Sequence, residues 1–288
     1  MDVTKILTTD LPAVVGLVED GNNILWIHNP QEKILQKVKV NDEIDLIQEL
    51  NGVKVYDITK LVNDEGYLLS IYSNHTLTML TTKGQLKPLS NISPFLPLGI
   101  HITKENDILV GFQENAPTFP ITETSRRGIK KLGMDRKVKF NFEYDKDKRR
   151  LFTCPYRITT NINGDICVAD IITADNSGRV AVLGYDGSVK WSYIGNPEVN
   201  GGWNKFNPEG IATTSQGHIV ITDCNNHAIH VLSMEGNLIL CQKTMQLNFI
   251  APCSVCMGEN DTLKIGCSST KGKSEAQIVF LKLNIETY

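Results

Sequence analysis

The amino-acid sequence predicts an all-β protein, a six-bladed β-propeller with four-stranded blades. Three observations lead to this fold: a turn-and-strand pattern that recurs six times, a proline at a fixed distance before most of these repeats, and four strands in each complete repeat. Because the repeats follow one another through the chain without a linker, we expect residues 1–288 to form a single, monomeric domain.

Six segments begin with a polar or glycine-containing turn and continue as a strand of alternating apolar and polar residues. They cover residues 20–29, 64–73, 104–113, 162–171, 215–224 and 259–268. Their first core positions are Ile24, Leu68, Ile108, Ile166, Ile219 and Leu263, at intervals of 44, 40, 58, 53 and 44 residues. A repeat of this size cannot bury both of its faces alone, so it must pack against its neighbours.

A proline stands eleven residues before the first core position in the last four repeats, at Pro97, Pro155, Pro208 and Pro252. In the first repeat the proline is one position further away, and the second repeat has none. A proline is tolerated as the first residue of a strand because no ladder hydrogen bond of the sheet is lost there. The fixed offset therefore predicts that each of these prolines opens the first strand of a blade.

The sixth repeat is one strand short, since the chain ends soon after the strand that begins at Ile278. The N-terminal segment 3–9 reads as a strand that belongs to no repeat. We expect it to pair with the last blade as its outer strand. This pairing closes the ring and removes two open sheet edges.

The stretch Phe206–Gly236 is the most regular repeat. Gly217 supplies the positive φ that a short hairpin needs. Asp223 is placed to accept backbone N–H groups in the following turn, where Asn225 or Asn226 tolerates the left-handed conformation.

Composition narrows the function. A net charge of −3 and a pI near 6.1 give no global attraction to nucleic acid or to acidic membranes. No apolar run approaches the roughly 18 residues of a membrane span, and the first residues do not resemble a signal peptide. Seven cysteines, most of them in strand-like runs, read as free thiols in a reducing compartment. We therefore expect a cytoplasmic or nuclear protein with no membrane partner.

The sequence offers little that resembles catalytic chemistry, with no phosphate-binding loop and no nucleophile elbow. Cys253 and Cys256 have metal-ligand spacing, but on a strand residues three apart point to opposite faces. Asp170 and Asp223 occupy the same repeat position, which indicates turn capping. His230 is expected to point outward. We predict no catalytic residues, no metal site and no cofactor.

Phe206–Gly236 resembles the NHL repeat, whose Asn-His-Leu signature here reads Asn226-His227-Ala228. Residues 163–170 resemble it as well, and the divergent repeats look like the C-terminal NHL propellers of tripartite-motif (TRIM) proteins. The resemblance implies a non-catalytic recognition module, the substrate-recognition part of a TRIM-type ubiquitin ligase. Any ligase activity would lie in a RING domain outside this chain. Some NHL propellers bind RNA.

The alternative is an enzyme, because calcium-dependent lactonases and arylesterases are also six-bladed propellers. Their sites need Glu, Asn and Asp side chains along the axial channel to hold the ion. Glu209 and Asn161 are the obvious candidates here, and the first repeat offers no acidic residue at 11–15. We therefore expect binding rather than catalysis.

The charge distribution predicts where a partner binds. Residues 126–150 contain eleven basic and four acidic side chains, a local charge of +7. In a propeller, the loop between the second and third strands and the loop to the next blade emerge on the same face. The predicted binding residues on this face are Arg126, Arg127, Lys146, Lys148, Arg149, Arg150, Tyr156, Arg157, Trp203, Lys205 and Phe206.

Cations beside aromatic rings suit single-stranded RNA, and an acidic peptide of a protein substrate fits such a patch equally well. The lysines from Lys130 to Lys139 read instead as a solvated outer blade edge, where they deter edge pairing. Lys271 and Lys273 form a further basic loop.

Overall fold

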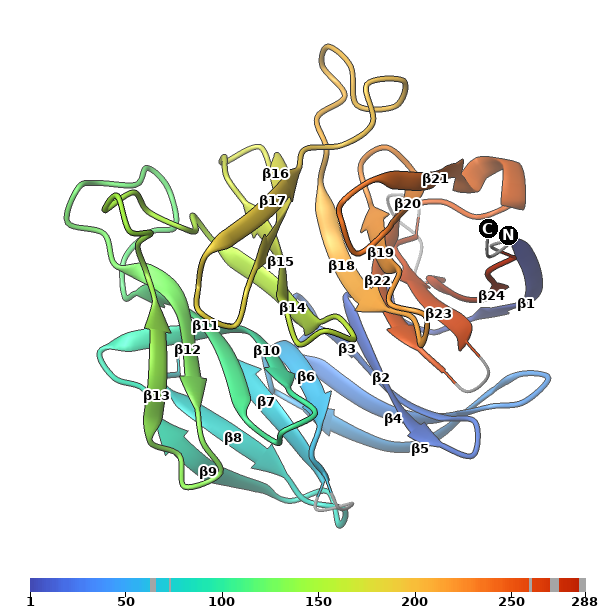
Figure 1. Ribbon diagram of the computed structural model, residues 1–288. Helices are drawn as coiled ribbons and strands as arrows, with labels where there is room; N and C mark the ends of the chain where they lie inside the picture. Colours follow the sequence, from blue (N-terminus) through green and yellow to red (C-terminus); the bar gives the residue numbers. More distant parts are fainter. Residues whose placement is uncertain (63–65, 73, 259–260, 270–274, 285–288) are drawn as a thin grey trace. The chain divides into compact units, whose positions relative to one another are not determined.

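A computed structural model describes residues 1–288 except 63–65, 73, 259–260, 270–274 and 285–288. The described strands form six antiparallel four-stranded sheets, and the fold is an all-β six-bladed propeller (Figure 1). The predicted fold class and the number of strands per blade are confirmed. No helix in the described part of the chain is long and apolar enough to cross a membrane.

The chain divides into two compact units of three blades each. The first comprises Met1–Lys54, Asn196–Asn204 and Glu209–Tyr288, and the second comprises Val55–Gly195 and Lys205–Pro208. The prediction of a single domain stays a prediction.

The first unit contains blades one, five and six. Blade one consists of β2 (Gly16–Gly21), β3 (Ile24–Asn29), β4 (Ile34–Val40) and β5 (Ile44–Asn51). Blade five consists of β18 (Pro208–Thr213), β19 (Ile219–Asp223), β20 (Ala228–Leu232) and β21 (Leu238–Lys243), followed by a 3-10 turn, η2 (Thr244–Leu247). Blade six consists of β22 (Pro252–Met257), β23 (Thr262–Cys267), β24 (Gln277–Lys282) and β1 (Asp2–Thr8).

The second unit contains blades two, three and four. Blade two consists of β6 (Val55–Lys60), β7 (Tyr67–Ile71), β8 (Thr76–Leu80) and β9 (Leu86–Asn91). Blade three consists of β10 (Phe95–Ile102), β11 (Ile108–Glu114), β12 (Arg127–Leu132) and β13 (Val138–Phe142). Blade four consists of β14 (Pro155–Thr160), β15 (Ile166–Ile171), β16 (Gly178–Leu183) and β17 (Val189–Tyr193).

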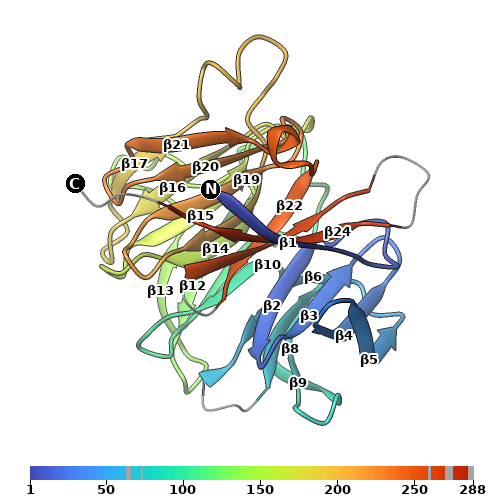
Figure 2. The same cartoon turned by 90° about the vertical axis from the view of Figure 1, so that its right-hand side faces the viewer.

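The N-terminal strand completes blade six, as predicted. β1 pairs antiparallel with β24, with Leu7 opposite Ile278 and Ile6 opposite Val279 (Figure 2). Leu7 and Ile278 belong to one buried cluster with Leu25 and Ile27 of blade one. Strand β1 therefore covers a sheet edge and also contributes a side chain to the core of its unit. Burial of one such side chain stabilises the fold by about 1.5–3 kcal/mol.

Three of the four prolines open a strand as predicted, and the prediction was wrong for Pro97. Pro155, Pro208 and Pro252 are the first residues of β14, β18 and β22, and Pro97 is the third residue of β10. Pro155 also marks a close approach of two blades, since a Cβ on Gly111 of β11 would lie 2.7 Å from its carbonyl oxygen. Glycine at 111 therefore lets blades three and four pack closely.

The hairpins of blade five follow the prediction with one correction. Gly217 has a φ of +88°, as expected. In the turn after β19, however, the left-handed residue is His227, with a φ of 50°, and the prediction of Asn225 or Asn226 was wrong. The His227 imidazole accepts a hydrogen bond from the Ala251 N–H through Nδ1 at 3.0 Å, and this bond ties the turn to the entry of blade six.

Candidate binding surface

Arg127 opens β12 and is fully buried, so the structure does not offer it to a partner. Its guanidinium donates to Glu114 Oε1 at 2.9 Å and to the carbonyl oxygens of Thr118 at 2.6 Å and Thr153 at 3.0 Å. These bonds join the loop between β11 and β12 to the entry of blade four. Although we predicted a binding residue here, the contacts of Arg127 are those of a structural residue.

Arg126 lies beside it with about half of its side chain exposed. Its Nε donates to Glu143 Oε2 at 3.0 Å and its Nη2 to Oε1 at 2.5 Å, a two-point ion pair. Burial opposes ionisation of Glu143, but hydrogen bonds from Arg126 and Asn141 bring the pKa of that carboxyl below its usual value. Much of the charge of Arg126 is therefore already matched within blade three.

Arg150 connects the loop that leads to blade four with the loop before β12. Its guanidinium donates to the carbonyl oxygens of Ser125 and Thr122 and lies 5.6 Å from the ring centre of Tyr144. The loop between β11 and β12 and the loop between β13 and β14, which we expected on one face of the propeller, therefore meet at Arg150.

Residues 144–150, which we call the basic turn, present the cations that remain available. Asp145 Oδ1 accepts the backbone N–H groups of Asp147 at 2.9 Å and Arg149 at 2.8 Å, and Lys148 adopts a left-handed φ of 61°. This bonding directs Lys146, Lys148 and Arg149 into solvent, where all three are exposed. The Arg149–Asp147 pair at 3.9 Å is solvent-exposed and contributes little.

The lysines of β12 and β13 make contacts within blade three. Lys130 Nζ lies 4.9 Å from the ring centre of Phe95 and 4.6 Å from that of Phe112. Lys131 and Lys139 both pair with Asp107, at 3.3 and 2.6 Å. The expectation of a freely solvated edge was therefore wrong for Lys130 and Lys131, because their side chains bend back over the sheet.

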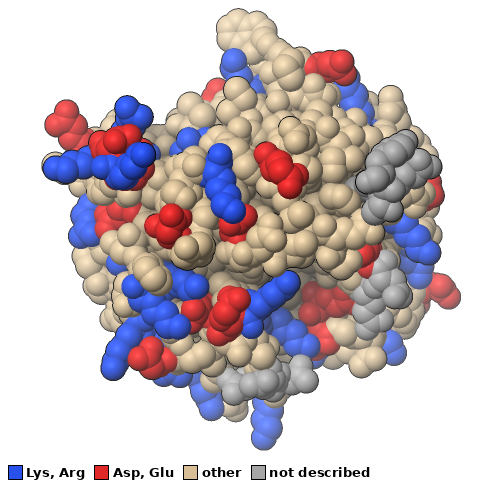
Figure 3. Space-filling view, in the orientation of Figure 1, with Lys and Arg blue, Asp and Glu red and all other residues tan. Residues whose placement is uncertain are grey.

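The local charge of +7 thus overstates the charge that a partner would meet. On the face shown in Figure 3, Lys and Arg side chains gather at the lower left, with Asp and Glu side chains beside them. Lys271 and Lys273, the further basic loop, lie outside the described residues.

Tyr156 and Arg157 belong to a compact cluster in the first strands of the second unit. Arg157 is buried, 4.2 Å from the ring centre of Tyr156 and 5.6 Å from that of Tyr56, and its Nε lies 3.7 Å from Asp57 Oδ1. Burial disfavours the charge, but the neighbouring Tyr156 and Asp57 keep the pKa of Arg157 above its usual value. The rings of this cluster are therefore occupied by an internal cation.

The three remaining predicted residues have different environments. Trp203 is 99% exposed, in a loop that Asn200 fastens by donating from Nδ2 to Asp223 at 2.6 Å. Lys205 is exposed, whereas Phe206 is buried, with its ring edge-on to Tyr193 at 5.4 Å. Phe206 thus packs in the core.

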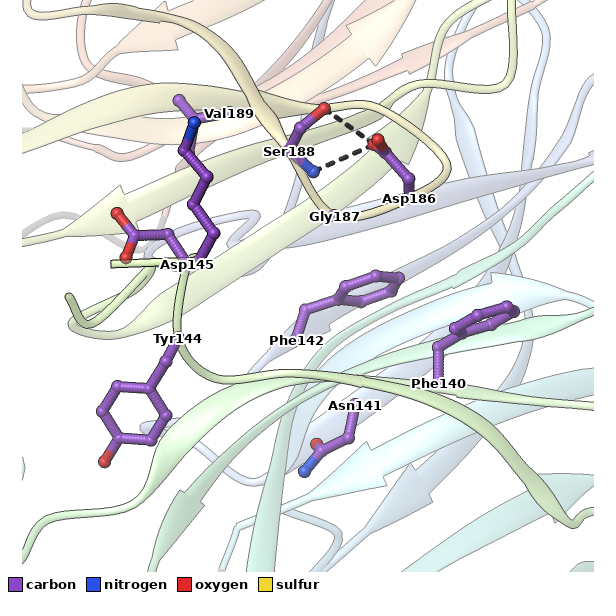
Figure 4. Close-up of a pocket in the computed structure, with 10 residues that line it drawn as sticks. Phe140, Asn141, Phe142, Tyr144, Asp145, Asp186, Gly187, Ser188 and Val189 are labelled. Carbon is purple, nitrogen blue, oxygen red and sulfur yellow. Dashed lines mark hydrogen bonds between the residues drawn. The ribbon is translucent and has the colours of Figure 1, made fainter. Parts of the chain in front are cut away.

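A groove of about 650 Å³ adjoins the basic turn. It is lined by Phe140, Asn141, Phe142, Tyr144, Asp145, Lys146, Asp186, Gly187, Ser188 and Val189. Figure 4 shows the rings of Phe140 and Phe142 on the side of β13 that faces the Gly187 turn, and Asn141 on the opposite side. The two rings stack with their centres 6.0 Å apart. Sequence reasoning missed this groove, although the alternation in β13 already placed both rings on one face.

Asn161, one of the two candidate calcium ligands, uses its side chain within its own blade. Asn161 is buried, and its Nδ2 donates to Asp165 Oδ2 while its Oδ1 accepts the backbone N–H groups of Asn163 and Asp165, each at 3.0 Å. Asn161 therefore forms the turn between β14 and β15. Glu209 is half-buried in β18. Within the described residues, no three His, Cys, Asp or Glu side chains are grouped to bind a metal ion.

Asp170 and Asp223 lie at the ends of the second strands, Asp170 one residue before the end of β15 and Asp223 as the last residue of β19. Asp170 accepts the backbone N–H groups of Thr153 and Cys154, both at 2.8 Å, and so caps the entry of blade four. His230 was expected to point outward, and this was wrong: it is fully buried, with Nε2 3.4 Å from Asp223 Oδ2. All five residues of β20 are buried. The alternating direction of side chains along this third strand therefore does not predict which of them are exposed to solvent.

Comparison with known proteins supports the repeat and the fold. Residues 207–232, which span β18 to β20, match the family model of the NHL repeat. No curated protein matches the sequence.

Several solved propellers share the fold at low sequence identity. A luciferin-regenerating enzyme aligns with a TM-score of 0.65 at 14% identity, over 96% of this chain and 94% of that chain. A putative gluconolactonase gives 0.64 at 13% over 95% and 87%, and virginiamycin B lyase from Staphylococcus aureus gives 0.62 at 13% over 98% of both chains. At these identities the likeness concerns the fold alone.

Proposed function

We propose that this chain is a non-catalytic recognition module that binds an acidic segment of a protein partner on the basic turn and its adjoining groove. The observation that carries the proposal is the juxtaposition of three outward cations, Lys146, Lys148 and Arg149, with a groove floored by stacked phenylalanines. An apolar floor with a charged rim is typical of a surface that takes an extended peptide.

A protein partner is favoured over single-stranded RNA by the state of the cations and rings. Arg126 and Arg127 are paired with carboxylates, and Arg150 is bound to backbone carbonyls. Phe206 is buried, and the Tyr156 ring already stacks on Arg157. A surface for single-stranded RNA needs unmatched cations along a phosphate track and free rings for the bases.

Charge reversal on the basic turn tests the proposal. We expect Lys148→Glu with Arg149→Glu to weaken binding of acidic peptides from a random library by about tenfold, since two exposed charges change sign. The matched control reverses Arg136 and Lys137, which are exposed on the turn between β12 and β13. Fluorescence anisotropy at low and physiological salt measures both variants.

The results of these binding measurements distinguish an acidic peptide from single-stranded RNA as the partner. Peptide binding that is lost in the 148/149 variant and kept in the 136/137 variant supports the proposal. Binding of a random single-stranded RNA pool without peptide binding, lost in the same variant, would replace the protein partner by RNA. Equal binding by both variants, or none by the unmodified protein, overturns the proposed surface.

The absence of catalysis is also a proposal, and the enzymes that share the fold make it worth testing. The support is that Asn161, one of the two candidate calcium ligands, uses its side chain in a turn. We expect the melting temperature to be the same in millimolar calcium and in EDTA, with no turnover of lactone or aryl ester substrates. A calcium-dependent rise in melting temperature together with ester hydrolysis would replace recognition by catalysis.

We also propose that the module serves as the substrate-recognition part of a TRIM-type ubiquitin ligase. The resemblance of its divergent repeats to TRIM propellers supports this. The test is to fuse the chain to a RING domain and to follow ubiquitination of a bound acidic-peptide fusion. Modification that is independent of Lys148 and Arg149 would count against it.

A further inference from the structure

Two of the seven free cysteines lie together in the first unit, although 29 residues separate them in sequence. Cys224 follows β19 in blade five, and Cys253 is the second residue of β22 in blade six. Their Sγ atoms are 3.2 Å apart. Cys224 is half-buried and Cys253 is buried, so a reagent in solution reaches the pair from the side of Cys224.

We propose that Cys224 and Cys253 form an oxidisable pair that closes to an intramolecular disulfide when the protein meets a peroxide. A disulfide requires a sulfur–sulfur distance of about 2.05 Å, so the two sulfur atoms must approach by roughly 1 Å, which side-chain rotation can supply. The first strand of blade five lies close to the strand that carries Cys253, because a Cβ on Gly210 of β18 would lie 3.0 Å from Ser254 Cα and 2.8 Å from Thr222 Oγ1 of β19.

The surroundings assign different roles to the two thiols. The Cys253 Sγ donates to the carbonyl oxygen of Ala251 at 3.2 Å, and it is shielded from solvent. Its hydrogen bond with Cys224 and its burial both raise the pKa of Cys253 well above the usual value of a thiol. Cys253 therefore stays protonated, and the oxidant meets the more accessible sulfur of Cys224 first.

The reaction proceeds in two balanced steps. The Cys224 sulfur attacks one oxygen of hydrogen peroxide, the O–O bond breaks, and the departing hydroxide takes up the Cys224 thiol proton and leaves as water, which gives a sulfenic acid. The Cys253 sulfur then attacks the Cys224 sulfur, the S–O bond breaks, and water leaves with the Cys253 proton. Two thiols lose two electrons in total, and one hydrogen peroxide is reduced to two water molecules.

The bond would fasten blade five to blade six beside a hydrogen-bonded turn. Asp223, next to Cys224, accepts hydrogen bonds from the side chains of Asn226 and Asn200, the latter in the loop that carries Trp203. A cross-link that closes a loop of this length restricts the unfolded chain, so the oxidised protein should melt several degrees higher than the reduced protein.

The chain offers a matched control in Cys241. It is also a half-buried thiol, and its Sγ contacts His230 Nε2 at 3.9 Å. Cys267, which is buried at the end of β23, is the competing partner to consider, since its β-ladder position is opposite Pro252, the neighbour of Cys253.

The experiment treats the native protein with stoichiometric hydrogen peroxide and then maps the peptides by mass spectrometry. We expect a loss of two hydrogens, a linked Cys224–Cys253 peptide and full reversal by dithiothreitol. The link should be absent in Cys224→Ser and in Cys253→Ala but present in Cys241→Ser. The mapping on the unmodified protein decides the question even if a variant fails to fold.

Three results would overturn the inference. In the first, Cys224 is oxidised to a sulfinic acid while Cys253 stays free for alkylation. In the second, both thiols remain fully alkylatable after peroxide. In the third, Cys224 is linked to Cys267, which would show that Cys253 is not the disulfide partner of Cys224.

Discussion

At the scale of single residues, the buried contact between His230 and Asp223 links the protein's stability to pH. Burial of the imidazole opposes its charge, but the hydrogen bonds and charges of Asp223 and Cys241 together outweigh burial and raise the pKa of His230 above its usual value of 6.5. A group whose pKa is raised on folding stabilises the protein fully below its unfolded pKa, and this stabilisation disappears as the pH rises through the folded pKa.

We therefore expect the melting temperature of the unmodified protein to fall as the pH rises from about 6 to 8, the range in which histidine loses its proton. His230→Gln, which cannot carry the charge, should show a flatter profile over the same range. Asp223→Asn should flatten it too, because the partner that favours the imidazolium is gone. Parallel profiles for all three proteins would contradict the assignment. Differential scanning fluorimetry in a buffer series measures them.

At the scale of elements, Arg127 fixes the start of β12 by binding Glu114 and the carbonyls of two neighbouring segments. Arg127→Met should lower the free energy of unfolding by about 3 kcal/mol, since it leaves a carboxylate and buried carbonyls without their donor. Arg126→Met, at the adjacent exposed position, should cost about 1 kcal/mol or less. Urea denaturation compares the two, and equal losses would show that Arg127 has no special structural role.

The contrast between these neighbours shows where sequence reasoning stops. Two consecutive arginines look alike in the sequence, and both were predicted to bind a partner. Their environments differ because residue 127 faces inward from the pleated strand toward Thr153, which lies 26 residues further on in another blade. Contacts between blades also bring Cys224 and Cys253 together. A local pattern does not contain them.

At the scale of the whole molecule, the sequence was sufficient for the architecture. The prolines at β14, β18 and β22, the positive φ of Gly217 and the alternation of the second strands each reflect a local backbone requirement, which one sequence reveals. Counting the strands of each repeat showed that the sixth repeat lacks one, and the unassigned N-terminal strand was the remaining candidate to complete blade six. The candidate surface was harder to predict, because the partners of its cations come from several elements.

The pairing of β1 with β24 provides a last prediction at this scale. Removing residues 1–9 should leave β24 with an unpaired edge and uncover the cluster around Leu7 and Ile278, so we expect a lower melting temperature and aggregation on heating. Asp2 lies opposite Lys282, and the two strands are antiparallel. A circular permutant that begins at residue 10 and appends residues 1–9 after the C-terminus would therefore form this pair as a hairpin. It should recover the melting temperature of the unmodified protein, whereas a permutant carrying Leu7→Asp should not. If the truncated chain melts like the unmodified one, β1 contributes nothing to the stability of the propeller.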